Sequence, residues 1–291
     1  METMSFLDHI RACNAHDLSG FRPFELDGHT VGWVRHALAE ALPGVDPGFV
    51  VTPDRLTIAP EIRDFEARST LLDHAAAYLV EQGTVTALRG EYYPVLPRWG
   101  AEPLARLDRA AVGAFGIEAF GLHINGYVRD ETAGNGAGGL LLWVGRRARD
   151  REVAPGQLDN LIAGGQPIGL TLAENLEKEA AEEAGLDAET ARRAVPVGAI
   201  SYTMETPAGL KRDRLFVYDL ELPPGLTPVN TDGEVEVFEL WPLDKVAESV
   251  RGTGDWKFNV NLVVTDFLIR HGWLTPENEP DYLEIVCGLR R

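Results

Sequence analysis

Residues 164–186 read GGQPIGLTLAENLEKEAAEEAGL, a glycine-rich loop that runs directly into an acidic helix. Thr171 is placed to cap the start of this helix, and Glu174, three residues later, completes a capping box. Gly185 marks the end, because glycine tolerates the left-handed conformation just beyond a helix terminus. The stretch therefore predicts a loop followed by a helix bounded by Thr171 and Gly185.

Charge is distributed around this predicted helix in a way that calls for a cation. At about 100° per residue, Glu183 falls between Leu172 and Leu176, and Glu179 and Glu182 lie beside the same apolar stripe. A carboxylate within such a stripe is partly desolvated, which is costly unless a cation or strong donors compensate. Carboxylates at this spacing also repel one another. The helical phase therefore favours a divalent cation among the three glutamates.

The stretch resembles the Nudix box, Gly-x5-Glu-x7-Arg-Glu-U-x-Glu-Glu-x-Gly-U, in which U is a bulky aliphatic residue. Residues 179–186, EAAEEAGL, match the second half of this motif, and the spacing of the first half works from Gly164. Lys178 replaces the arginine of the box, which keeps the charge but loses the bidentate fork. Leu170 stands in place of the first glutamate, and Ala180 is small for its aliphatic position. These departures leave the metal-binding glutamates intact.

Beyond the box, the chain resembles one Nudix subgroup whose members carry an N-terminal extension and whose related domains occur fused to thiamine pyrophosphokinase. Lysine in the box and the pair Glu174-Asn175 are typical of this subgroup. The resemblance implies a Nudix α/β/α sandwich at residues 119–291. It also implies an N-terminal α+β extension domain at residues 1–118, with a role in substrate binding, in dimerisation or in completing the fold. The matching segments are residues 31–33, 91–95, 120–128, 155–160, 216–222 and 266–272.

The composition excludes several classes of partner. The 291 residues include 45 acidic against 27 basic side chains, a net charge of −18, which argues against nucleic acid and against an anionic membrane. With 45% hydrophobic residues, the chain can bury a substantial core. Cys13 and Cys287 lack metal-ligand spacing and are expected to be reduced thiols. Without a signal-peptide pattern or a membrane-spanning apolar run, the expected location is the cytoplasm.

Periodicity divides the chain into a mixed N-terminal part and a strand-rich part from about residue 119. Glycines at residues 134–139 predict a turn, and the apolar run at residues 140–144 predicts a strand covered on both faces. The pattern predicts helices at residues 5–20, 31–42, 64–82, 106–115 and 259–271. It predicts further strands at residues 49–51, 56–58, 120–128, 195–203, 214–222 and 234–241.

By the resemblance, the acidic helix would hold Mg²⁺ or Mn²⁺ as the cofactor. Glu179 and Glu183 would be the principal ligands and catalytic residues. Glu182 would be a ligand directly or through water, and the Gly164 carbonyl would be a further contact. Hard oxygen ligands suit such a cation, which acts as Lewis acid, template and water activator in diphosphate cleavage.

Further charged side chains have candidate roles beside the glutamates. Lys178 either orients Glu182 or pairs with Glu174, and the helical phase favours Glu174. In this family the general base often comes from a later acidic loop, for which Glu234 and Glu236 are the candidates, with Glu234 ahead. The alternative for both is a solvated acidic strand edge.

Three basic residues are candidates for binding substrate: Arg147, Lys211 and Arg212. Arg147 follows Arg146 at the end of a predicted strand, where it either contacts a phosphate or is solvated. Lys211 and Arg212 form a local basic cluster with Arg214. The cluster either holds a substrate phosphate or forms the tip of a surface hairpin, and the hairpin tip is the favoured interpretation.

The predicted activity is that of a metal-dependent pyrophosphohydrolase, which cleaves an X-diphosphate, a small molecule, to the monophosphate plus phosphate. The subgroup resemblance points to thiamine diphosphate or its oxidised derivatives. A hydrolase of ADP-ribose or another nucleoside diphosphate sugar, and a catalytically weak ligand-binding module, are the alternatives. Trp33, Tyr92, Tyr93 and Trp99 could stack on a heteroaromatic ring, although core packing is favoured for most of them. Whether the protein forms a homodimer stays open.

Overall fold

The computed structural model describes residues 4–130 and 139–291, and its centre is a mixed seven-stranded sheet. The strands follow the order β11-β12-β7-β8-β13, with β10 beside β7 and β9 beside β8. β7 and β12 run parallel in the middle of the sheet, whereas β10 and β8 run antiparallel to β7. The strands are β7 (Glu118–Arg129), β8 (Leu140–Arg147), β9 (Leu158–Asp159), β10 (Ile162–Gly165), β11 (Val195–Thr206), β12 (Gly209–Glu221) and β13 (Val235–Pro242).

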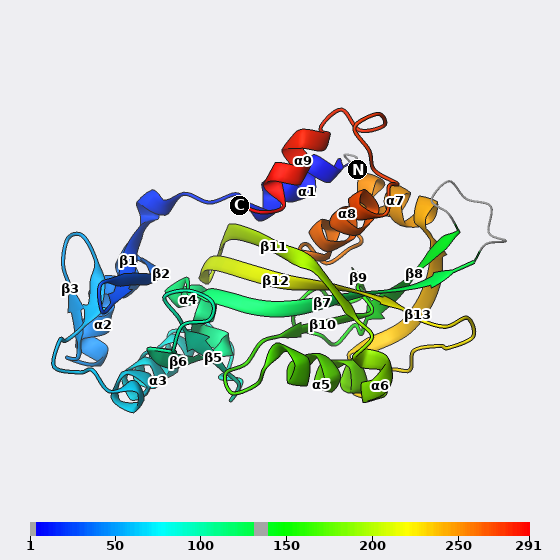
Figure 1. Cartoon of the computed structure of the whole chain (residues 1–291). Helices are drawn as coiled ribbons and strands as arrows, with labels where there is room; N and C mark the ends of the chain where they lie inside the picture. The colour runs from blue at the N-terminus through cyan, green and yellow to red at the C-terminus, as the bar shows by residue number, and fades with distance from the viewer. Residues whose placement is uncertain (1–3, 131–138) are drawn as a thin grey trace.

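Helices cover both faces of this sheet (Figure 1). On one face, Leu176 and Ala180 of α5 join Leu122 and Ile124 of β7 in one hydrophobic cluster. The predicted α/β/α sandwich is therefore confirmed. The first face carries α5 (Leu172–Ala184) and α6 (Ala188–Ala191), and the second face carries α1 (Phe6–Cys13), α7 (Leu243–Gly252), α8 (Val260–Arg270) and α9 (Tyr282–Gly288).

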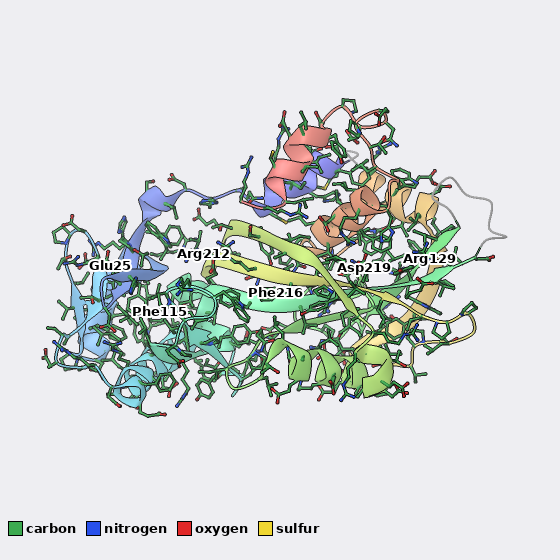
Figure 2. The ribbon with its side chains drawn as sticks, viewed as in Figure 1. Glu25, Phe115, Arg129, Arg212, Phe216 and Asp219 are labelled. Carbon is green, nitrogen blue, oxygen red and sulfur yellow. The ribbon has the colours of Figure 1, made fainter. Side chains whose placement is uncertain are left out.

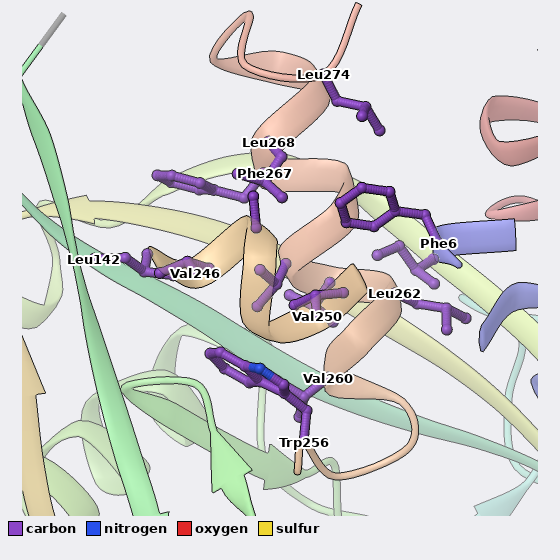
Figure 3. Packing of buried hydrophobic residues seen from close by; sticks show 14 of the residues in the cluster. Phe6, Leu142, Val246, Val250, Trp256, Val260, Leu262, Phe267, Leu268 and Leu274 are labelled. Atoms are coloured by element: carbon purple, nitrogen blue, oxygen red, sulfur yellow. The ribbon is translucent and has the colours of Figure 1, made fainter. Parts of the chain in front are cut away.

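The core beneath the second face joins the two ends of the chain. Phe6 of α1 packs with Val250 of α7 and Phe267 of α8, as Figure 3 shows. Leu215 and Val217 of β12 belong to the same hydrophobic cluster. Because side chains alternate along a strand, these two residues face the second group of helices while their neighbours face the first. The first helix of the chain thus completes the core of the C-terminal helices.

The N-terminal extension is an α+β unit, as predicted. Its four-stranded sheet has the order β2-β1-β4-β3, and a separate hairpin joins β5 to β6. Phe24, Leu72 and Phe115 are fully buried in its core. The predicted domain boundary after residue 118 stays a prediction; β7 begins there. The elements are β1 (Phe21–Leu26), β2 (His29–Arg35), α2 (His36–Val45), β3 (Phe49–Val51), β4 (Leu56–Ile58), α3 (Phe65–Glu81), β5 (Tyr92–Val95), β6 (Ala105–Asp108) and α4 (Val112–Phe115), with short 3-10 turns at Leu18–Gly20 and Arg109–Ala111.

Several predicted elements match the structure, and some do not. The helices predicted at residues 64–82 and 259–271 are confirmed as α3 and α8, and the predicted strands are confirmed as β3, β4, β7, β8, β11, β12 and β13. The turn predicted at residues 134–139 lies outside the described residues except for Gly139. The helix predicted at residues 5–20 ends at Cys13, and α6, α7 and α9 were not predicted.

Two helix predictions in the extension are wrong over part of their length. Residues 31–35 belong to β2, where they pair with β1, and the helix begins only at His36. Residues 106–108 belong to β6, and the Asp108 carboxylate then accepts the Ala110 amide to open a 3-10 turn. In both places pairing with the preceding strand outweighs the local helical pattern.

Candidate functional site

The site is built on the junction between β10 and α5. The backbone N–H of Gln166 fixes the start of the loop between them, because it donates to the Phe120 carbonyl at 2.8 Å. Thr171 and Glu174 form the predicted capping box. Gly185 ends the helix in the left-handed conformation, with φ of 62°. The predicted loop and helix are therefore confirmed, and they set the orientation of the glutamates on α5.

Glu183 is the carboxylate that the fold buries. Its side chain lies against β10, and it is only 8% exposed. One carboxylate oxygen accepts the Ala163 amide at 2.8 Å. Burial raises the pKa of Glu183 to about 8, and the charge of Glu179 adds to this effect. The burial that the helical phase predicts for Glu183 is confirmed, and its role as a metal ligand stays a prediction.

Glu179 lies one helical turn earlier and packs against Gly164. A Cβ atom at position 164 would lie 2.4 Å from Cδ of Glu179, so only glycine leaves room for this carboxylate. The side chain is 12% exposed, and burial raises its pKa above the usual value. Glu182 is half exposed. The structure therefore brings Glu179, Glu183 and Gly164 together and leaves Glu182 at the rim.

Lys178 connects two of these glutamates. Its Nζ donates to Glu179 at 3.0 Å and to Glu182 at 2.8 Å. Although burial lowers its pKa, these hydrogen bonds hold the pKa of Lys178 above its usual value. The favoured pairing of Lys178 with Glu174 is wrong, because the Glu174 carboxylate accepts from the backbone and hydroxyl of Thr171 instead.

The donor chemistry of the site fits a hard divalent cation. In the described ranges, no group of three or more His, Cys, Asp or Glu side chains is already gathered around a metal position. The Lys178 ammonium instead balances the charge of Glu179 and Glu182. Carboxylate oxygens are nevertheless the ligands that Mg²⁺ and Mn²⁺ prefer, and the buried Glu183 gains most from a cation.

The candidate general bases lie on a segment that touches the C-terminal end of α5. The Val229 amide donates to the Ala184 carbonyl, and Thr231 Oγ1 lies 3.0 Å from the Ala181 carbonyl. Glu234 follows directly and forms an ion pair with Arg151 at 2.7 Å. Glu236 is half exposed and lies 3.8 Å from Arg149. Of the two, Glu234 is nearer in sequence to Val229 and Thr231, the residues that contact α5.

The predicted phosphate-binding cations already have partners. Arg147 is buried and donates to Asp159 at 2.8 Å. Lys211 lies 2.9 Å from Asp213, and Arg212, labelled in Figure 2, donates to the Gly116 carbonyl at 3.1 Å. Lys211 and Arg212 both lie on β12, and this strand pairs with β11 on one side and with β7 on the other. The structure therefore does not gather these three cations around the glutamates of α5.

A chain of buried polar side chains, not singled out from the sequence, lies behind Glu183. Asp159 accepts from Lys257 at 3.2 Å, and Oδ1 of its neighbour Asn160 accepts from His123 Nδ1 at 2.8 Å. Although burial raises the pKa of Asp159, Lys257 and Arg147 hold it below its usual value. The charges of Asp159 and Lys257 both act on Glu183. The chain continues through Asn125 to Asp219, which Figure 2 labels.

His123 makes the stability of the protein depend on pH. Burial lowers the pKa of its imidazole to about 4, against about 6.5 in an unfolded chain. Between these values the unfolded state binds more protons, so the free energy of unfolding should fall by up to about 3 kcal/mol as the pH drops from 6.5 to 4. Urea denaturation across this range measures the slope. His123→Gln should flatten it and the exposed-residue control His29→Gln should not; equal slopes for all three would contradict the assignment.

The extension reaches the site through its β5–β6 hairpin. The Ile168 amide of the loop donates to the Tyr92 carbonyl at 2.9 Å. A Cβ atom on Gly165 would lie 1.6 Å from the Tyr93 hydroxyl, so this hydroxyl packs directly against the glycine backbone. Trp99 packs on Phe120 and Phe216, with ring centroids 4.7 Å away in each case. The extension therefore forms part of the wall beside the glycine loop.

Two cavities in the described part of the chain lie away from these glutamates. One, of about 300 Å³, is lined by Arg35, Tyr78 and Pro207 among others. The other, of about 270 Å³, is lined by residues that include Tyr127 and Asp219. No residue of α5 lines either cavity. Neither cavity therefore belongs to the site formed by the glutamates of α5.

Comparison with known proteins identifies a matching family model and two similar proteins. A family model described as a domain of unknown function (DUF4743) matches residues 5–119. The chain is 38% identical over 296 residues to "Nudix hydrolase 20, chloroplastic" of Arabidopsis thaliana, covering 98% of this chain and 77% of that protein. It is 37% identical over 289 residues to "Nudix hydrolase 24, chloroplastic" of the same plant, with the same coverage of 98% and 77%.

Part of the chain is also similar to a solved structure. The NUDIX domain of Shewanella oneidensis NrtR, solved with ADP ribose, covers 54% of this chain and 90% of its own at 12% identity, with a TM-score of 0.39. Within residues 4–130 and 139–291, no helix has both the length and the apolar character required to cross a membrane.

Proposed function

The chain belongs to the Nudix hydrolase family, and from this premise we propose that it cleaves the diphosphate of a small molecule with Mg²⁺ or Mn²⁺ as cofactor. The products would be the monophosphate and phosphate. The observation that carries the proposal is the burial of Glu183 beside Glu179 on one side of α5. A buried pair of carboxylates is costly unless a cation compensates.

The residues of the chain would divide the work at this site. Glu179 and Glu183 would hold the cation, with Glu182 and the Gly164 carbonyl as further contacts. When bound, the cation supplies Lewis acidity and activates a water molecule. The Ala163 amide fixes one oxygen of Glu183 and so orients its carboxylate. Lys178, held between Glu179 and Glu182, would keep the outer carboxylate in place.

Glu234 is our candidate for the general base, with Glu236 as the alternative. The attachment of residues 229–231 to the end of α5 supports Glu234, because it couples this segment to the helix that carries Glu183. The Glu234 carboxylate is held by the ion pair with Arg151. Arg147, Lys211 and Arg212 stay candidates for substrate binding only if substrate displaces their present partners.

Replacing Glu234 with glutamine should lower kcat by about 100-fold, because a positioned general base contributes 10²–10⁴-fold in rate. Glu236→Gln is the matched control, with the same change of charge two residues away, and should alter kcat less than about twofold. Initial rates of phosphate release measure both. Equal rates for Glu234→Gln and the wild type would exclude Glu234 as the base, and a loss confined to Glu236→Gln would assign the role there.

For the substrate, we propose thiamine diphosphate or one of its oxidised derivatives. The support is the subgroup resemblance, which spans both the box and the extension. The alternative is ADP-ribose or another nucleoside diphosphate sugar; ADP ribose is the ligand named for the NrtR domain. The predicted cytoplasmic location stays a prediction, and both Arabidopsis relatives carry the word chloroplastic in their names.

A panel of diphosphates assayed with Mg²⁺ tests this proposal. Thiamine diphosphate, its oxidised forms, ADP-ribose and a nucleoside diphosphate sugar are compared by release of phosphate or AMP. We expect kcat/KM for a thiamine-type diphosphate to exceed that for ADP-ribose by about tenfold or more, a difference of about 1.4 kcal/mol. Faster turnover of ADP-ribose would overturn the substrate. Hydrolysis of none of them would favour the binding module.

A further inference from the structure

The β5–β6 hairpin of the extension holds an arginine close to the carboxylates of α5. Arg109 follows directly after β6, and its amide donates to the Glu91 carbonyl at 2.8 Å. The buried Asp108 carboxylate accepts the amides of Arg89, Gly90 and Ala110. This carboxylate therefore fixes the backbone on both sides of the hairpin. The position of Arg109 is set before any ligand arrives.

The guanidinium of Arg109 is anchored but not enclosed. Its NH1 donates to Glu91 at 2.8 Å, and the group lies 5.9 Å from the centre of the Tyr93 ring. The side chain is still 54% exposed. A guanidinium has five N–H donors in one plane. A group held at one edge by Glu91 can thus present other donors to an anion.

Contacts and charge both place Arg109 beside the proposed diphosphate site. The Tyr93 hydroxyl packs on Gly165, next to Gly164, which in turn packs on Glu179. Partial burial lowers the pKa of Arg109, but the carboxylates of Glu91 and Glu179 hold it above its usual value. The electrostatic influence of Glu179 therefore reaches Arg109.

A diphosphate bound at these glutamates needs positive charge in a protein of net charge −18. Three other cations of this region are paired with carboxylates: Lys178 with Glu179 and Glu182, and Arg147 and Lys257 with Asp159. We propose that Arg109 binds a phosphate group of the substrate, so that the extension supplies a substrate-binding residue to the hydrolase site. The planar fork of arginine suits two oxygens of one phosphate. This inference rests on the proposed diphosphate function and assigns the extension a role in it.

Binding of methylenediphosphonate, a diphosphate analogue that cannot be hydrolysed, tests the role of Arg109 directly. Isothermal titration with Mg²⁺ present compares the wild type, Arg109→Gln, Arg109→Lys and Arg55→Gln. Arg55 is the matched control because it also lies in the extension, pairs with a glutamate, Glu25, and is also 54% exposed. We expect Arg109→Gln to weaken binding by about 10-fold or more, Arg109→Lys to weaken it less, and Arg55→Gln to leave it within about twofold.

Two results would overturn the inference. One is equal binding by Arg109→Gln and the wild type; the other is an equal loss in Arg55→Gln, which would indicate a general effect of surface charge. Circular dichroism and Tm of each variant separate a loss of binding from a loss of fold. If Arg109→Gln loses binding only because it unfolds, the folded variant Arg109→Lys decides. Binding by Arg109→Lys equal to that by the control Arg55→Gln would then also count against the inference.

The same titration separates this inference from the proposed function. If the wild type hydrolyses diphosphates but binds the analogue without help from Arg109, only the role of Arg109 fails. If no diphosphate is hydrolysed and binding still depends on Arg109, the hydrolase proposal fails and the phosphate-binding role stands.

Discussion

Replacing Glu183 with glutamine should lower kcat/KM for the diphosphate substrate by at least about 100-fold while the protein stays folded. Glutamine keeps the shape of the side chain and an oxygen for the Ala163 amide, but it removes the charge that a divalent cation requires. Its helical phase, its burial and its raised pKa are the grounds for the proposal that this carboxylate depends on a cation. Release of phosphate under saturating Mg²⁺ measures the loss.

The same variant should be more stable than the wild type when no metal is present. A buried carboxylate destabilises the folded state, so its removal should raise Tm of the metal-free protein by a few degrees, as about 1 kcal/mol corresponds to 2–4 °C in a chain of this size class. Glu177→Gln is the matched control on α5, where Glu177 pairs with Arg192 at 2.7 Å. Activity within about twofold of wild type in Glu183→Gln would refute the metal-helix mechanism. A lower Tm would instead assign Glu183 a structural role.

Chelation of divalent cations should reduce hydrolysis below detection, and Mg²⁺ or Mn²⁺ should restore it. A bound metal would contribute several kcal/mol of charge stabilisation to the reaction. We would treat the wild-type protein with EDTA and measure its rate before and after adding each metal. We expect added metal also to raise Tm of the wild type, because a ligand that binds only the folded state stabilises it.

The variant Glu183→Gln serves as the control for chelation, since its Tm should not respond to Mg²⁺. Full activity of the EDTA-treated wild type would contradict a metal-dependent mechanism. An equal rise in Tm for both proteins would place the metal at another position in the chain.

The geometry of α5 could be predicted because it depends on neighbouring residues only. Thr171, Glu174 and Gly185 determine where the helix begins and ends, and a regular helix then fixes the angle of every side chain between them. The burial of Glu183 follows from that angle. The partner of Lys178 was mispredicted for an equally local reason, because the cap engages the Glu174 carboxylate.

Other features of the site could not be predicted, since they join distant parts of the chain. Asp159 and Lys257 are 98 residues apart, and nothing in either local pattern indicates that they meet. Arg109 comes close to Glu179 only because the β5–β6 hairpin packs on the loop at Gly165. Residues 31–35 pair with the preceding strand β1 although their apolar spacing favours a helix. Tertiary contacts override local preference at each of these positions.

Titration of Mn²⁺ followed by electron paramagnetic resonance tests the central claim most directly, because it does not depend on which group carries the diphosphate. We predict that the wild type binds Mn²⁺ at the α5 carboxylates, that Glu183→Gln binds it at least about tenfold more weakly, and that Glu177→Gln binds it like the wild type. Equal Mn²⁺ affinity in the wild type and Glu183→Gln would contradict the assignment of these glutamates as the metal site.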